Sequence, residues 1–312
     1  MSTSAARFRR GIKKGSKAYS LSKDFFSTSL GEQLLSNTQF KICIRNNYFN
    51  IYWNGCSILK YSPLARVHIY NIHHKYVGIK RPTPNNPYVD LSPKYNNDTL
   101  CDLIYGDWSF SKEILGTDRN GQMSSRVEEY IKGGSEDSEK KNLSQYLKAN
   151  NPCWLDLEVA FSRKSKNTKG EDIFVADRID LAVIEDTDTG KPVLKFIEVK
   201  MANDSRLKKK DNELPSVCEK MRIYKNSFID DQRDSLFESY RVVAQNMIDF
   251  RLANDRMGLI ERWIDGGVVA PYPYLLVLSA KNTLADHHYD KIDAWMKANG
   301  YPLEGLICHH PG

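Results

Sequence analysis

Three strand-like segments follow one another closely between residues 153 and 200, and their order constrains the fold more than any other feature of the chain. They read CWLDLEVAF, FVADRIDLAVIE and VLKFIEVK. The polar stretches between them, KSKNTKGED and DTDTGKP, are short enough for antiparallel hairpins. The sequence therefore predicts three neighbouring strands in one sheet.

Helical patterns surround these strands. SSRVEEYIK and SEDSEKKNLSQYLKAN precede them, and Pro152 ends the second. Pro215 suits the first turn of a helix with an apolar face made by Val217, Met221, Tyr224 and Phe228. Helices over about 235–253, 256–264 and 287–300 and strands in PYPYLLVLSA and EGLICHH complete the order. From about residue 122 the prediction is α-β-β-β-α-(α)-β-α-β, an α/β (α+β) fold.

Residues 38–80 have the composition of an antiparallel meander of four or five strands. FKICI, NYFNIYW, CSILKY and ARVHIY are rich in β-branched and aromatic residues. Asn54-Gly55 predicts a hairpin turn, because both residues tolerate positive φ, and Asn46-Asn47 predicts another. Tyr48, Phe49, Tyr52, Trp53, Tyr61 and Tyr70 are expected to fill the core of this sheet, with a base-stacking platform as the alternative.

The distribution of charge and of loop-forming residues suggests that the chain has three regions. Residues 1–24 hold seven basic residues and one acid, which equals the net charge of +6 of the whole chain. Residues 81–100 carry four prolines and four asparagines, as loops do. We predict a basic flexible arm over 1–24, a β-rich module over 25–115 and a catalytic domain over 116–312. The arm would be either a solvated leader or a contact to nucleic-acid phosphates.

Two classes of protein are disfavoured by the pattern of residues. No apolar run approaches the about 20 residues of a membrane span, so we expect a cytoplasmic protein with no membrane partner. The six cysteines show no CxxC spacing and are expected to be buried thiols. Adjacent histidines, as in His73-His74, point to opposite faces of a strand, so no zinc site is predicted.

A catalytic site is predicted on the second and third of the three strands. Glu198 and Lys200 are two residues apart, so they project from one face about 6–7 Å apart. Val199 points into the core, while its main-chain carbonyl offers a third oxygen next to the carboxylates of Glu198 and Asp180. Carboxylate and carbonyl oxygens are the ligands of hard cations such as Mg²⁺ or Mn²⁺. A cation there lowers the pKa of bound water and neutralises charge on a phosphodiester.

Other acids near this site remain open as ligands. Glu158 on the first strand, or Glu128 and Glu129 on the preceding helix, could add a further carboxylate. Asp177 lies an odd number of residues from Asp180 and is expected to face the other way. Just after the third strand, a basic cluster could hold a phosphate backbone or form a solvated loop. Its members are Arg206, Lys208, Lys209 and Lys210.

The arrangement resembles the PD-(D/E)xK nuclease superfamily over roughly residues 122–280. RIDLAV resembles the second strand of many members, and FIEVK resembles their third. The resemblance implies a restriction-endonuclease-like αβββαβ core, with Asp180 and Glu198 as metal ligands and Lys200 as the catalytic lysine. Several branches carry QxxxY on the next helix. Here the segment reads KMRIY, so Lys220 replaces the glutamine and Tyr224 matches the tyrosine.

The resemblance implies a Mg²⁺-dependent endonuclease acting on DNA, with Lys220 and Tyr224 joining the basic cluster in binding nucleic acid. Such cores often work as homodimers. By analogy, the chain could act in microbial restriction or anti-phage defence, with a partner protein of that system. The alternatives are an RNA-cleaving or DNA-repair nuclease on the same core, and a catalytically silent nucleic-acid-binding or assembly subunit.

Overall fold

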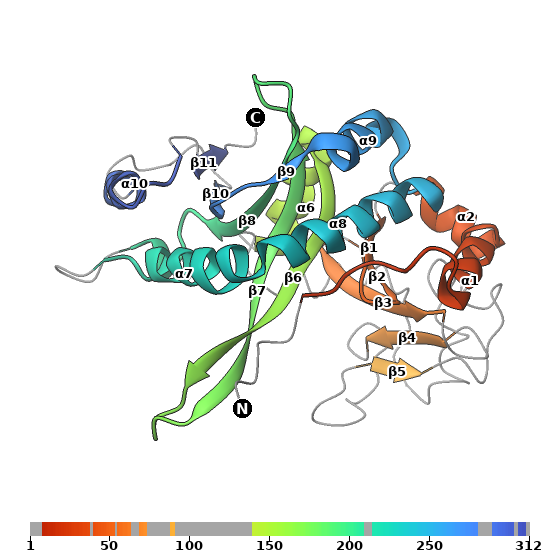
Figure 1. Ribbon diagram of the computed structural model, residues 1–312, viewed down its shortest axis with the longest axis horizontal. Helices are drawn as coiled ribbons and strands as arrows, with labels where there is room; N and C mark the ends of the chain where they lie inside the picture. The colour runs from red at the N-terminus through yellow and green to blue at the C-terminus, as the bar shows by residue number, and fades with distance from the viewer. Residues whose placement is uncertain are drawn as a thin grey trace. The chain divides into compact units, whose positions relative to one another are not determined.

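A computed structural model describes residues 8–37, 40–53, 55–63, 69–73, 88–90, 139–208, 214–279, 289–302 and 305–309 (Figure 1). The chain forms two compact units, each built from discontinuous segments. One comprises Met1–Arg9, Gln145–Ala244 and Asp255–Gly312, and the other Arg10–Ser144 and Gln245–Asn254. The predicted boundary near residue 115 lies outside the described residues, so a division there stays a prediction.

The unit that contains Arg10–Ser144 holds an antiparallel sheet of five strands. They are β1 (Phe40–Ile44), β2 (Phe49–Trp53), β3 (Cys56–Ser62), β4 (Ile69–His73) and β5 (Tyr88–Asp90), paired in chain order. The predicted meander is confirmed. Asn47 adopts a φ of 61° in the β1–β2 turn, the left-handed conformation that asparagine tolerates.

The aromatic residues of this sheet form its core. Phe49, Tyr52, Trp53 and Tyr61 are all buried. Phe49 and Tyr61 lie with ring centroids 5.8 Å apart, and Phe25 stacks on Tyr61 at 4.0 Å. Buried rings cannot stack on nucleobases, so these four residues are structural. Tyr48 is half-buried.

The predicted flexible arm is wrong for the described part of residues 1–24. Residues from Lys17 onward belong to helix α1 (Lys17–Phe26), which is followed by α2 (Ser29–Ser36). The Ser16 hydroxyl caps α1 by accepting from the N–H of Tyr19. Ile12 is fully buried, and its backbone exchanges two hydrogen bonds with the Asn246 side chain. Sparse apolar residues among the cations were the signal for this folded segment.

The other unit contains a curled, mixed sheet whose paired order is β11-β10-β8-β7-β6, with β9 added beside β8. The strands are β6 (Cys153–Lys166), β7 (Asp172–Glu185), β8 (Val193–Met201), β9 (Val268–Val269), β10 (Tyr274–Leu278) and β11 (Leu306–His309). β6, β7 and β8 are antiparallel, whereas β8, β10 and β11 are parallel. The predicted hairpins are thus confirmed, and the chain has a mixed α/β fold.

Helices alternate with these strands in the predicted order. They are α6 (Glu139–Asn150), α7 (Ser216–Tyr224), α8 (Asp231–Asp249), α9 (Met257–Gly266) and α10 (Tyr289–Ala298). The helix predicted to begin near residue 235 begins earlier, because a π-helical turn, η3 (Lys225–Asp230), joins α7 directly to α8. The predicted apolar face of α7 is buried as expected. Within the described ranges, no helix has the length and apolarity to cross a membrane.

Candidate active site

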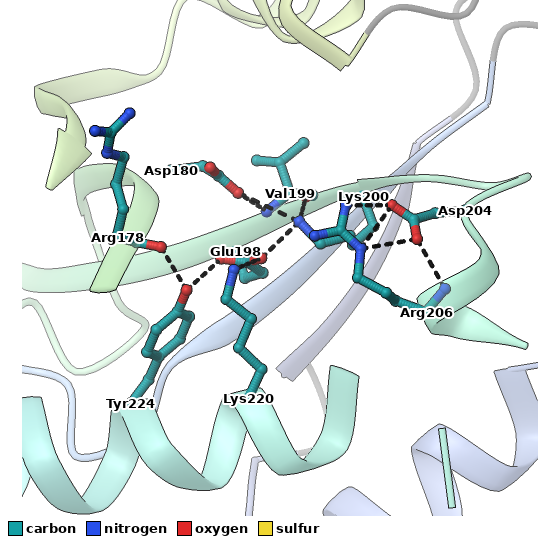
Figure 2. A network of polar contacts seen from close by, with 9 residues as sticks. All are labelled: Arg178, Asp180, Glu198, Val199, Lys200, Asp204, Arg206, Lys220 and Tyr224. Atoms are coloured by element: carbon teal, nitrogen blue, oxygen red, sulfur yellow. Dashed lines mark hydrogen bonds and ion pairs between the residues drawn. The ribbon is translucent and has the colours of Figure 1, made fainter. Parts of the chain in front are cut away.

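Asp180, Glu198 and Lys200 meet where β7 and β8 separate (Figure 2). The β7–β8 pairing ends at Leu181 and Ile197, so one residue further along each strand the backbones no longer pair. There the Asp180 carboxylate accepts a hydrogen bond of 2.8 Å from the Val199 N–H. A hydrogen bond to a side chain therefore links the two strands just beyond the last backbone pair.

Glu198 is the centre of the site, and its side chain is fully buried. Lys200 Nζ lies 2.5 Å from Glu198 Oε1, and Lys220 Nζ lies 2.8 Å from the same oxygen. The Tyr224 hydroxyl lies 3.1 Å from Oε2 and donates to it. Two cations and one neutral donor thus compensate a carboxylate that would otherwise be costly to bury.

Lys200 links the two carboxylates. Its side chain is 2% exposed, and Nζ lies 3.7 Å from Asp180 Oδ2 as well as close to Glu198. Nζ also donates to the Val199 carbonyl. The ammonium group therefore contacts the three central oxygen donors of the predicted metal site: the carboxylates of Asp180 and Glu198 and the Val199 carbonyl.

Tyr224 is held as a hydrogen-bond donor. Burial is the main cause of its raised pKa, and the negative charges of Glu198 and Asp180 raise the pKa further. The hydroxyl therefore keeps its single proton, which is shared between two acceptors, the Arg178 carbonyl and Glu198 Oε2. Because Tyr224 has no exposed surface, the predicted contact between this side chain and nucleic acid is wrong. The residue orients Glu198 instead.

Asp204 is a site neighbour that sequence reasoning missed. Its carboxylate caps the short helix η2 (Ser205–Leu207) and binds Arg206 through both oxygens, with the shortest distance 2.6 Å to Nη2. Burial raises the pKa of Asp204, but the hydrogen bonds and charge of Arg206 and the charge of Lys200 lower it by more. The only sequence signal was an Asp directly before a Ser-Arg pair, which many turns share.

The remaining predicted residues have mixed outcomes. Glu158 lies beside the site but forms an ion pair with Arg178 at 3.2 Å. Arg206 is engaged by Asp204, and Lys208 is exposed. Lys220 is bound to Glu198 while a third of its side chain remains exposed. Four further residues, Glu128, Glu129, Lys209 and Lys210, lie outside the described residues.

The donor set suits a hard divalent cation, since it consists of carboxylate and carbonyl oxygens. The described residues supply two such carboxylates, Asp180 and Glu198, and within these residues no group of three His, Cys, Asp or Glu side chains converges as a metal site. A bound cation would have to replace the Lys200 ammonium between the carboxylates. Water and substrate oxygens would then complete its coordination, as is usual for Mg²⁺.

Comparison with protein-family models, curated proteins and solved structures finds no match to this chain. The resemblance to PD-(D/E)xK nucleases thus rests on the residues around Asp180 and Glu198 and on the order of the elements.

Proposed function

We propose that the chain is a metal-dependent nuclease that hydrolyses DNA phosphodiester bonds. The observation that carries this proposal is the convergence of Asp180 and Glu198, from adjacent strands, on one buried lysine. Charged groups are costly to bury together, so a buried cluster of two carboxylates and a lysine needs a reason such as binding or catalysis. The same three residues carry the resemblance to the PD-(D/E)xK superfamily.

Each residue has a distinct role in this proposal. Asp180, Glu198 and the Val199 carbonyl hold Mg²⁺ or Mn²⁺. The bound ion supplies a more acidic water and neutralises charge on the phosphate. Lys200, released from the carboxylates, stabilises negative charge on the phosphate oxygens. Hydrolysis adds the water oxygen to phosphorus, breaks one P–O ester bond and returns a proton to the leaving oxygen. Tyr224 and Lys220 keep Glu198 oriented.

Cleavage assays test the proposal directly. Supercoiled plasmid and single-stranded RNA are incubated with the protein in Mg²⁺ or in EDTA. We expect plasmid cleavage in Mg²⁺ only, and a loss of at least about a hundredfold in Asp180→Asn and Lys200→Met. Asp186→Asn is the matched control, because this exposed carboxylate follows the same strand, pairs with Arg262 and takes no part in the site. Cleavage that persists in EDTA or in both site variants would refute the metal site.

Metal binding gives a second readout that does not depend on turnover. Because the Lys200 ammonium contacts the oxygen donors, a cation competes with it for them. Calorimetric titration with Mg²⁺ should show binding lost in Asp180→Asn but kept or tightened in Lys200→Met. Weaker binding in Lys200→Met than in the parent would contradict the idea that the ammonium and the cation use the same oxygens.

A catalytically silent nucleic-acid-binding subunit is the second candidate. The observation that favours it is the saturation of Glu198, whose two oxygens already contact Lys200, Lys220 and Tyr224. In that case the protein would bind DNA or RNA without cleaving either and without a heat of Mg²⁺ binding. RNA as the cleaved substrate would appear in the same assay as cleavage of the RNA alone.

A further inference from the structure

Beyond the site, β6 and β7 continue as a two-stranded ribbon that extends past the rest of the sheet (Figure 1). We define the ribbon as the paired residues 160–166 and 172–178. Ladder partners share a face, and side chains alternate between faces along each strand. One face, here called the outer face, therefore consists of Ala160, Ser162, Lys164, Lys166, Asp172, Phe174, Ala176 and Arg178.

The two faces of the ribbon have different environments. At the base of the inner face, the Phe161 ring stacks on Phe228 of η3 with centroids 4.3 Å apart. Further out on that face, Arg163 pairs with Asp177. Every residue of the outer face is exposed, and Phe174 has 56% of its surface in contact with solvent. Phe174 is thus a large apolar side chain on a strand face that no described element covers, and Ile173 beside it on the inner face is 38% exposed.

Charge on the outer face favours nucleic acid as that partner. Lys164 and Lys166 form no ion pair with the described carboxylates. Arg178 adds a third cation, which forms an ion pair with Glu158 at 3.2 Å and stays 57% exposed. Asp172, opposite Lys166, is the single acid of this face and lies at its far end. The small side chains between the cations leave the backbone close to the surface.

We propose that the outer face of the ribbon lies in the major groove of double-stranded DNA beside the cleaved bond; this rests on the proposed nuclease function. The major groove, about 12 Å wide, admits a two-stranded β-ribbon. Lys164, Lys166 and Arg178 hold phosphates at its rims, while Phe174 and Ala176 contact base edges and thymine methyl groups.

The geometry of β7 places the ribbon on one side of the cleaved bond. Phe174 precedes Asp180 by six residues on one continuous strand. At about 3.3 Å per residue this is about 20 Å, or roughly six base pairs at 3.4 Å each. The ribbon therefore contacts DNA about one half-turn of duplex away from the scissile phosphate.

Binding in EDTA tests the surface without catalysis. Lys164→Glu/Lys166→Glu is compared with Lys148→Glu/Lys191→Glu, an equal charge change at two exposed lysines outside the ribbon. We expect the ribbon variant to lose at least about tenfold in duplex affinity at 0.1 M salt and to reduce the salt slope by about 2, since each phosphate contact contributes about 0.9. The control should change both values far less. Equal effects in the two variants would overturn the proposal.

Two further outcomes separate other uses of the ribbon. A loss of single-strand affinity with duplex affinity intact would replace the groove with a single-strand track. A change of oligomeric state without DNA, measured by sedimentation, would identify the partner as a second copy of this chain. Either result would overturn the proposal, whereas a duplex-specific loss in a protein of unchanged oligomeric state supports it.

The position of the ribbon on DNA is tested by placing a photoreactive phenylalanine analogue at residue 174 of the full chain. Crosslinks to duplex should map about six base pairs from the cut in one direction. Crosslinks at the cut itself, or none, would overturn the placement. If the parent protein cleaves nothing, the nuclease proposal fails, and the salt-slope comparison still decides whether the ribbon binds DNA.

Discussion

At the scale of single residues, Glu198 explains how the protein keeps charged groups in its interior. Its carboxylate has no exposed surface and contacts the side chains of Lys200, Lys220 and Tyr224. The two lysines differ in burial, since Lys200 is 2% exposed and Lys220 is 32% exposed. The stability that each pair contributes should differ accordingly, because solvent screens an exposed partner.

We expect Lys200→Met to lower the free energy of unfolding by about 3 kcal/mol, since it leaves Asp180 and Glu198 with one cation fewer in a buried site. Lys220→Met should cost about 1 kcal/mol or less. Urea denaturation followed by circular dichroism measures both. Replacing both members of the buried pair, Glu198→Leu/Lys200→Met, should recover part of the loss. A double variant less stable than Lys200→Met would contradict this.

Tyr19 offers a test of pH dependence away from the candidate site. Its hydroxyl lies 2.6 Å from Asp249 Oδ2, and its pKa is raised to about 12, chiefly by burial and then by Asp249. An unfolded tyrosine has a pKa near 10.0. Between about pH 10 and 12 the unfolded state binds fewer protons, so the contribution of Tyr19 is complete below pH 10 and is lost as pH rises. The stability difference between the parent and Tyr19→Phe should therefore be larger at pH 8 than at pH 11, and a constant difference would refute the assignment.

At the scale of elements, strand β6 contains the main irregularity of the sheet. The pairing of β6 with β7 shifts between Trp154 and Asp156, and Glu158 adopts a φ of 50°. This left-handed conformation costs a residue with a Cβ about 1–2 kcal/mol, whereas glycine adopts it freely. The irregularity lies beside Asp180 and precedes the exposed ribbon.

Comparing two substitutions at Glu158 separates strain from ligand chemistry. Both Glu158→Ala and Glu158→Gly remove the carboxylate and its ion pair with Arg178. Glycine relieves the positive φ, so Glu158→Gly should be more stable than Glu158→Ala by about 1 kcal/mol in thermal or urea unfolding. If Glu158 is structural, both variants keep Mg²⁺ binding. Loss of Mg²⁺ binding in both would make Glu158 a metal ligand.

At the scale of the whole molecule, a bound cation should act as a stabiliser. Ligands that bind only the folded state at a hundred times their dissociation constant add about 2.7 kcal/mol. For a unit of 150–250 residues this corresponds to about 5–10 °C in Tm. We expect saturating Mg²⁺ to raise the Tm of the parent and of Asp186→Asn, but not that of Asp180→Asn. An equal rise in all three would place Mg²⁺ elsewhere on the protein.

Local patterns in the sequence determined the strands, the hairpins and the shared face of Glu198 and Lys200. They did so because side-chain alternation in a strand depends only on neighbouring residues. The apolar stripe of α7 and the buried strand β10 followed from the same kind of short-range signal. The mixed α/β class could therefore be predicted with no knowledge of contacts between distant residues.

Only the tertiary structure decided what surrounds the site. Lys220 and Tyr224 reach Glu198 from a helix more than twenty residues away. The hydrogen bond from the Ile12 N–H to Asn246 joins residues more than two hundred positions apart in the sequence. Such contacts depend on how helices pack on the sheet, which sums many small and non-directional terms. The sequence named Asp180, Glu198 and Lys200, but only packing showed that the lysine ammonium lies in contact with both carboxylates.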